Sequence, residues 1–221
     1  MEKSIDRLSL CIESGKISKD SAYPPAMKGQ DGADEITRQA LASGVSPSDI
    51  LEACMSGMQH IGERFGRNEV FVPELLMAAK AMNAVMAHLK PFFQSGEVKR
   101  KGTFVIGTVA GDLHDIGKKL VAMVVEGNGW EVVDLGVDIP PETFVKAVAE
   151  KPGCYVGLSA LLTTTMVNME KTVKTIKASH PTTKILVGGA PVTRDYATQI
   201  GADGYSPDPQ GAVQLLGQLA A

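Results

Sequence analysis

From residue 103 onward, short apolar runs alternate with segments of helical spacing, and this alternation restricts the fold more than any other feature. The runs predict five strands, at 103–110, 131–135, 155–160, 184–188 and 203–205. The segments between them predict helices. Strict alternation of strands and helices is typical of a parallel sheet with helices on both faces. Five strands favour the flavodoxin-like order 2-1-3-4-5, an α/β fold of the Rossmann-like kind.

The first hundred residues show apolar side chains at helical spacing instead. They predict a bundle of four helices, whose apolar stripes begin at Ile5, Ile36, Ile50 and Leu75. Ser48 and Asp49 lie where the third helix needs an N-cap, and Pro91 is expected to stop the fourth helix. We therefore expect a helical cap at 1–92, a linker at 93–102 and the sheet domain at 103–221.

Composition argues against several classes of protein. Hydrophobic residues make up 44% and charged residues 21%, the formal net charge is -3, and no basic patch stands out, so nucleic acid is not an expected partner. Residues 1–10 lack the apolar core of a signal peptide, and no run approaches the roughly 20 apolar residues that span a bilayer, so no membrane association is expected. Three widely spaced cysteines fit a cytoplasmic location.

Ligands of such sheets bind beyond the carboxyl ends of the strands, where the strand order reverses. The loop after the first strand is rich in polar residues and glycine, and it consists of Gly111, Asp112, Leu113, His114, Asp115, Ile116 and Gly117. Ser159, Ala160 and Leu161 close the third strand, and Gly188 and Gly189 close the fourth.

This loop has the pattern D-x-H-x-x-G and resembles that of cobalamin-binding domains. The wider stretch GTVAGDLHDIGKKLV, residues 107–121, is similar to the cobalamin domain of methionine synthase. Residues 55–82 resemble the helical cap of the same family. The resemblance covers roughly residues 35–215. It is strongest to the small corrinoid proteins of methanol, methylamine and O-demethylase methyltransferase systems, which consist of these two modules.

The resemblance implies that cobalamin is the cofactor, as methylcobalamin or cob(I)alamin, and that His114 binds its cobalt. An imidazole is a suitable neutral axial ligand for cobalt. Asp112, two residues earlier, would accept the other ring N–H, which fixes the tautomer and raises the basicity of the ligand. Gly111, Leu113, Asp115 and Ile116 would complete the cofactor loop. No residue of this chain is expected to be catalytic.

The nucleotide tail of the cofactor is expected to leave the cobalt and to insert along the sheet edge. A side chain at Gly117 would obstruct the tail, and Gly188 and Gly189 would let the backbone pass close to it. In the family the serine of the S-x-L motif contacts the tail, so the resemblance gives this role to Ser159 and Leu161. Thr163 is expected to contact the tail as well. Thr165 stands where methionine synthase has a serine that extends the Asp–His pair, and its hydroxyl offers the same hydrogen bond.

Other residues with chemical potential have simpler interpretations. His60 and His88 are expected to be ordinary helix residues and His180 a loop residue. Asp134 and Asp138 are expected at a strand end and in a turn. One face of the bundle is expected to cover the upper side of the corrin, with Phe65, Phe71 and Val72 as candidate contacts.

The expected function is that of a corrinoid methyl carrier, a cofactor-carrying subunit rather than a stand-alone enzyme. A substrate-specific methyltransferase would load the methyl group, and a second methyltransferase would pass it to tetrahydrofolate or a thiol. A reductive activase would restore oxidised cobalt. The alternatives are a cobalamin-dependent regulator or photoreceptor, the small subunit of an adenosylcobalamin mutase, and a flavodoxin-like domain without corrinoid. The sequence leaves the methyl donor and the oligomeric state open.

Overall fold

The computed structural model describes residues 2–220, with side chains from residue 5 onward. The chain divides into two compact units. One consists of residues 1–100 and 127–129, and the other of residues 101–126 and 130–221. We refer to them as the helical unit and the α/β unit.

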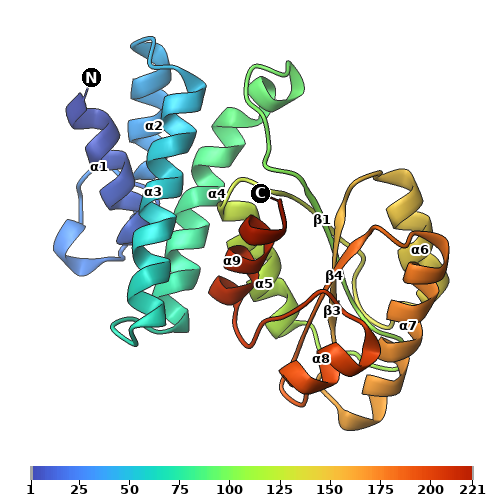
Figure 1. Ribbon diagram of the computed structural model, residues 1–221. Coiled ribbons are helices and arrows are strands. Elements are labelled where there is room, and N and C mark those ends of the chain that lie inside the picture. The colour runs from blue at the N-terminus through green and yellow to red at the C-terminus, as the bar shows by residue number, and fades with distance from the viewer. Residues whose placement is uncertain (1, 221) are drawn as a thin grey trace. The chain divides into compact units, whose positions relative to one another are not determined.

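The helical unit is the predicted bundle. Among the described residues it contains four α-helices, which are α1 (Glu2–Glu13), α2 (Ala33–Ala42), α3 (Pro47–Gly66) and α4 (Val72–Gln94) (Figure 1). A short 3-10 helix, Pro25–Met27, lies in the loop between α1 and α2. The helices pack through fully buried side chains at the predicted stripe positions, including Leu8, Ile12, Ile50, Met58, Ile61, Leu75, Met82 and Leu89.

Two expected helix ends were wrong. The N-cap of α3 is Ser46, whose hydroxyl accepts the backbone N–H of Asp49, and Pro47 occupies the first helical position, where a proline loses no hydrogen bond. Pro91 does not stop α4, which continues to Gln94 and so enters the expected linker. The proline lies in the last turn, and its carbonyl still accepts the N–H of Ser95.

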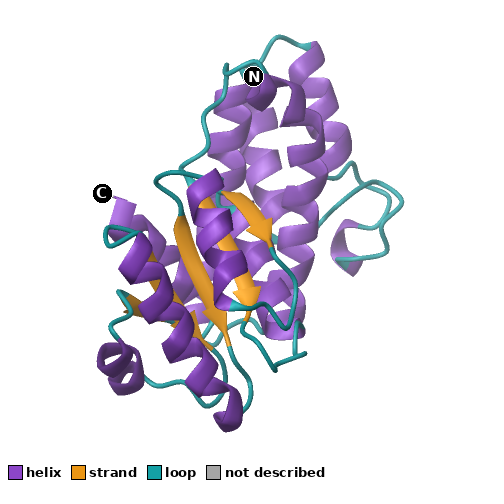
Figure 2. Cartoon of the chain, turned by 90° about the vertical axis from the view of Figure 1, so that its right-hand side faces the viewer, coloured by secondary structure: helices purple, strands orange, loops and turns teal. Residues whose placement is uncertain are grey.

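The α/β unit contains a parallel sheet with the predicted order. In the part of the chain that the structure describes, its strands are β1 (Thr103–Thr108), β2 (Glu131–Asp134), β3 (Tyr155–Ser159), β4 (Lys184–Gly188) and β5 (Gly204–Tyr205). They are arranged as β2-β1-β3-β4-β5, and every neighbouring pair is parallel (Figure 2). All carboxyl ends of the strands therefore lie at one edge.

Helices cover both faces of this sheet (Figure 1). On one face, α5 (Ile116–Gly127) and α9 (Pro209–Ala220) pack over Phe104, Ile106 and Leu186. On the other face lie α6 (Pro141–Glu150), α7 (Met166–Ser179) and α8 (Arg194–Ile200). Their core includes Val105, Phe144, Val156, Leu158, Met169, Val173, Ile185 and Val187.

Candidate functional site

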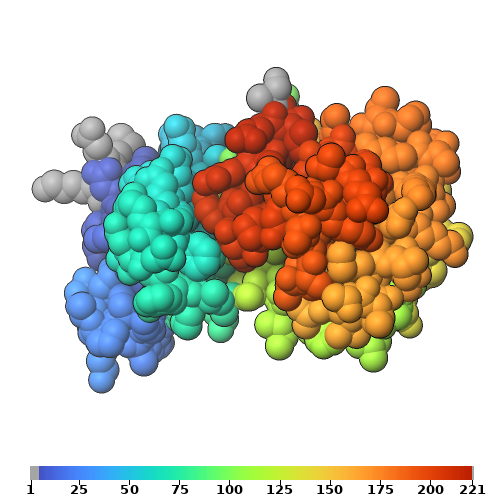
Figure 3. Space-filling model, turned by 60° about the horizontal axis from the view of Figure 1, so that its bottom comes forward, coloured from blue at the N-terminus to red at the C-terminus, as the bar shows by residue number. Residues whose placement is uncertain are grey.

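The chain adds β2 on one side of β1 and β3 on the other, so the strand order reverses between β1 and β3. The candidate site lies at the carboxyl ends of these two strands. The chain leaves β1 toward α5 on one face and leaves β3 toward α7 on the other face. Such a divergence opens a crevice at the edge of a parallel sheet. Figure 3 shows the yellow-green surface that follows β1 beside the orange surface that follows β3.

Asp112 joins the two segments across this crevice. Its side chain is completely buried. Oδ1 accepts hydrogen bonds from the backbone N–H of His114 at 3.0 Å and from Nδ1 of the same residue at 2.8 Å. Oδ2 accepts the backbone N–H of Leu161 at 2.7 Å and the hydroxyl of Thr165 at 2.8 Å. The carboxylate thus holds the histidine loop to the segment after β3.

These hydrogen bonds decide the charge of Asp112. Burial alone would raise the pKa of this carboxyl group, because it disfavours the charged form. The backbone N–H groups of Leu161 and His114 outweigh that effect, together with the side chains of Thr165 and His114, and they hold the pKa well below its usual range. Asp112 is therefore a carboxylate at neutral pH.

A carboxylate accepts hydrogen bonds only, so Nδ1 of His114 must carry the proton that it shares with Asp112. In a neutral imidazole the lone pair then belongs to Nε2. The His114 side chain is 51% exposed, and no hydrogen bond within the described residues engages Nε2. His114 therefore presents Nε2 as a nitrogen donor at the sheet edge, and its hydrogen bond to Asp112 fixes the tautomer.

Three further side chains hold the loop in place, and sequence reasoning assigned none of them to the site. The Thr108 hydroxyl donates to the carbonyl of His114 at 2.9 Å. Nδ2 of Asn168, in α7, donates to the carbonyl of Ala110 at 2.7 Å. Oδ1 of Asp138, in the turn after β2, accepts the N–H of Gly111 at 2.6 Å. The loop is thus tied to β1, to α7 and to the turn after β2.

A row of small residues crosses the carboxyl end of the sheet. Thr108 pairs with Ser159, Ser159 pairs with Gly188, and Ser206 follows β5 next to Gly188. Side chains alternate along a strand, so these four residues share the face of Phe104 and Leu186, which is covered by α5 and α9. We call Thr108, Ser159, Gly188 and Ser206 the small-residue row. Each of them has a short side chain or none.

The glycines around the row differ in what they permit. A Cβ at Gly117, in the first turn of α5, would meet no protein atom within 4 Å, so internal packing does not demand glycine there. A Cβ at Gly189 would lie 1.9 Å from the carbonyl oxygen of Ala160, and its φ is +128°. A Cβ at Gly188 would lie 2.9 Å from the oxygen of Ser206. The chain's own backbone thus explains Gly188 and Gly189, whereas Gly117 borders open space.

Large apolar side chains are exposed on the same two segments. Leu113 is 72% and Ile116 is 76% exposed on the histidine loop. The segment after β3 exposes Leu161, and also Leu162 and Val167, which sequence reasoning did not single out. Exposed apolar side chains gathered beside an available imidazole nitrogen suit a ligand with a broad apolar face.

Three further candidates from the sequence lie in exposed positions or in ion pairs. Thr163 is exposed in the 3-10 turn Thr163–Thr165. The carboxylate of Asp115 forms an ion pair with Lys119 one turn later, on the surface of α5. Asp134 forms an ion pair with the buried Lys118.

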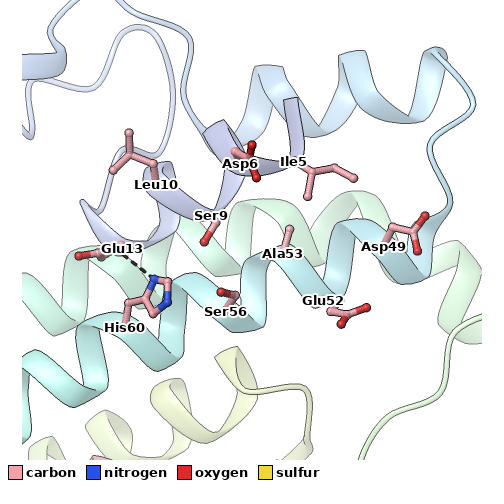
Figure 4. A pocket seen from close by; sticks show the side chains of 10 residues that line it. All are labelled: Ile5, Asp6, Ser9, Leu10, Glu13, Asp49, Glu52, Ala53, Ser56 and His60. Carbon is pink, nitrogen blue, oxygen red and sulfur yellow. Dashed lines mark ion pairs between the residues drawn. The ribbon is translucent and has the colours of Figure 1, made fainter. Parts of the chain in front are cut away.

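The two histidines that lie on helices, His60 and His88, each have a carboxylate partner. His88 Nε2 lies 2.7 Å from Asp34 Oδ1. His60 lines an open pocket of about 630 Å³ between α1 and α3, and its Nδ1 lies 3.5 Å from Glu13 (Figure 4). No group of three or more metal-binding side chains occurs among the described residues. His60 and His88 therefore show no geometry of a metal site.

The fold and the site define a module that binds a flat, metal-containing ligand. The exposed imidazole offers one nitrogen donor, and the open space at Gly117 suits an appended group. These features fit cobalamin, whose corrin already supplies four nitrogens to cobalt. Among the described residues, no helix is both long and apolar enough to cross a bilayer.

Comparison with known proteins agrees with this class. Residues 102–214 and residues 29–90 each match a family described as B12 binding domain. The trimethylamine corrinoid protein of Methanosarcina barkeri is 42% identical over 186 residues, covering 82% of this chain and 86% of that protein. The dimethylamine corrinoid protein of the same organism is 39% identical over 181 residues, covering 80% and 85%.

Two solved structures are similar over nearly the whole chain. The methanol:cobalamin methyltransferase complex MtaBC from Methanosarcina barkeri matches with a TM-score of 0.82 and 27% identity, over 99% of this chain and 80% of that chain. A cobalamin-binding protein from Desulfitobacterium hafniense matches with a TM-score of 0.76 and 30% identity, over 97% and 98%. This chain belongs to the family of cobalamin-binding corrinoid proteins.

Proposed function

We propose that this chain is the methyl carrier of a corrinoid-dependent methyltransferase system, with cobalamin held through Nε2 of His114. The observation that carries the proposal is the pairing of an exposed imidazole with a buried carboxylate. His114 Nδ1 lies 2.8 Å from Asp112, and this contact leaves Nε2 available at the sheet edge. Bound cobalamin would supply a cobalt centre that accepts a methyl group from one partner and gives it up to another.

The residues around His114 have separate roles in this proposal. Asp112 holds the proton at Nδ1, and this second-shell contact keeps Nε2 basic and oriented. Thr165 donates to the other oxygen of Asp112 and so supports the same carboxylate. Leu113, Ile116 and Leu161 would contact the apolar face of the corrin.

The nucleotide tail would occupy the space beside Gly117 and the small-residue row. Ser159, in the middle of that row, would offer a hydroxyl to the tail. In the helical unit, Phe71 is 66% and Val72 is 38% exposed at the start of α4. These two side chains are our candidates for shielding the opposite face of the corrin, with residues 95–102 as the hinge that lets partners reach it.

The relatives suggest the kind of methyl donor. Two of them are named for trimethylamine and dimethylamine, so we propose a methylamine as the donor class. A substrate-specific methyltransferase would load this chain, and a second methyltransferase would deliver the methyl group to tetrahydrofolate or a thiol. A reductive activase would restore oxidised cobalt. We place the system in the cytoplasm, which suits the free thiols of Cys11, Cys54 and Cys154.

Affinity capture followed by methyl transfer tests this proposal. Tagged protein loaded with cobalamin is recovered from cells grown on trimethylamine or on methanol, and copurifying proteins are identified. The loaded, reduced protein is then mixed with the captured methyltransferase and each donor, and methylation is followed by the change in visible absorbance. We expect methylation with a methylamine. Methylation that required methanol alone would contradict the proposed donor, and no methylation by any captured partner would contradict the carrier function.

Matched histidine variants show whether the transfer depends on the site. His114→Ala removes the proposed cobalt ligand, whereas His60→Ala removes a half-exposed histidine that pairs with Glu13 in the helical unit. We expect a changed absorbance spectrum and impaired methyl transfer for His114→Ala only. Equal behaviour of the two variants would contradict a role of His114 in holding the cofactor.

A further inference from the structure

Gln210 carries a buried acceptor that the protein itself does not satisfy. The residue is the second of α9 and is only 7% exposed. Its Oε1 atom is buried and has no hydrogen-bond partner among the described residues. Buried side-chain acceptors are hydrogen-bonded in the large majority of cases, and an unpaired one costs stability. An unpaired acceptor therefore points to a donor that arrives with a ligand.

The register of the sheet places Gln210 beside the small-residue row. β5 ends at Tyr205, and α9 begins four residues later at Pro209, so its first turn lies at the carboxyl edge of the sheet. A Cβ at Gly211, the next residue, would lie only 2.6 Å from Oγ of Ser206, the last member of the row.

The first turns of two helices thus border the same row. α5 and α9 both pack over the face that contains Phe104 and Leu186, and each begins at the carboxyl edge. Gly117 lies in the first turn of α5 beside open space, and Gln210 lies in the first turn of α9. The row crosses the sheet between them. The first turn of α9, which carries Gln210, therefore borders the space that our proposed function gives to the nucleotide tail.

We infer that Oε1 of Gln210 accepts a hydrogen bond from the nucleotide tail of the bound corrinoid, and that Gln210 makes the chain favour corrinoids with such a tail. The inference rests on the proposed function, because it requires cobalamin to bind at His114. The nucleotide has two sources of a donor, the free hydroxyls of its ribose and any O–H or N–H group on its base. The benzimidazole of cobalamin itself has neither group, so cobalamin offers the ribose alone.

Binding measurements with three corrinoids test this inference. The ligands are hydroxocobalamin, a cobamide whose base is 5-hydroxybenzimidazole, and cobinamide, which lacks the nucleotide but keeps the corrin amides. Dissociation constants are measured by absorbance titration for the wild-type protein, for Gln210→Met and for Gln214→Met. Methionine keeps the length of glutamine without its acceptor, and Gln214 is an exposed glutamine of the same helix.

We expect Gln210→Met to bind at least one tail-bearing corrinoid about tenfold more weakly, with cobinamide binding unchanged. Equal losses for both tail-bearing corrinoids identify the ribose hydroxyl as the donor. A loss confined to the hydroxybenzimidazole cobamide identifies the base. Gln214→Met should match the wild-type protein in every titration.

Thermal unfolding of the ligand-free variants separates recognition from folding. Because Oε1 has no partner among the described residues, Gln210→Met should unfold at the wild-type temperature or above it. Unchanged affinities for all three corrinoids, or an equal loss that includes cobinamide, would overturn the inference while leaving the proposed function intact. A wild-type protein that bound none of the corrinoids would overturn both.

Discussion

Oγ1 of Thr165 lies 2.8 Å from Oδ2 of Asp112, and it links the 3-10 turn after β3 to the carboxylate that holds His114. The same hydroxyl lies 2.8 Å from the carbonyl oxygen of Leu162. Both neighbours accept hydrogen bonds only, so one hydroxyl proton serves two acceptors. The threonine methyl group, absent from serine, does not prevent the contact with Asp112.

Thr165 variants separate the hydroxyl from the shape of the side chain. Thr165→Val removes the hydroxyl at nearly constant volume and leaves the buried carboxylate short of a donor, so we expect a loss of about 1–3 kcal/mol in the free energy of unfolding. Thr165→Ser keeps the hydroxyl and should cost less. Urea unfolding of the cofactor-free protein measures both values. A larger loss for Thr165→Ser than for Thr165→Val would mean that the methyl group, rather than the hydroxyl, matters at this position.

Asp112→Asn tests the carboxylate itself. An amide has one oxygen and one NH₂ group, so its NH₂ donor would face either the N–H groups of His114 or the N–H of Leu161 and the hydroxyl of Thr165. We expect cobalamin affinity to fall by about 10- to 100-fold, the range typical of lost second-shell contacts to metal ligands. Absorbance titration measures the affinity. Wild-type affinity in this variant would show that Asp112 does not support the cobalt ligand.

Much of the fold could be predicted because its signals are local. The alternation of apolar runs gave the strands within two residues of their observed ends, and the strand order followed from the parallel architecture. The end of α4 could not be predicted from Pro91, because a proline removes one hydrogen bond to the preceding turn and can kink a helix without ending it. Its carbonyl bonds to Ser95, which continues the turn.

The candidate site could also be predicted only in part from the sequence. The spacing of Asp112 and His114 predicts their contact, because two residues in one loop are close whatever the rest of the chain does. Asn168 and Asp138 could not be found in this way, since their hydrogen bonds to the histidine loop depend on how α7 and the turn after β2 pack. Gln210 has no sequence signal at all, because only its burial shows that its oxygen is unpaired.

Asp203 gives the α/β unit a defined sensitivity to acid. Burial would raise the pKa of its carboxyl group, but hydrogen bonds from Lys177 and from the backbone N–H of Ile185 lower it below its ordinary value. A depressed pKa in the folded state stabilises the protein above the unfolded pKa, and this contribution is lost as the pH falls through the folded pKa.

Asp203→Asn should therefore be less stable than the wild-type protein at pH 7, by about 1–3 kcal/mol. The difference should shrink as the pH falls below about 4, the ordinary pKa of an aspartate. Urea unfolding at a series of pH values measures this difference, and Asp20→Asn provides an exposed control. A gap that stayed constant from neutral to acid pH would refute this role of Asp203.

Electron paramagnetic resonance of the cobalt(II) form tests the central claim most directly, because a nitrogen bound to cobalt splits each line of the spectrum. Protein made with ¹⁵N-labelled histidine is loaded with unlabelled cobalamin. If Nε2 of His114 binds the metal, each line becomes a doublet, and this doublet disappears in His114→Ala but persists in His60→Ala. A triplet in the labelled protein would show that the unlabelled benzimidazole of the cofactor is the ligand, and it would contradict the account.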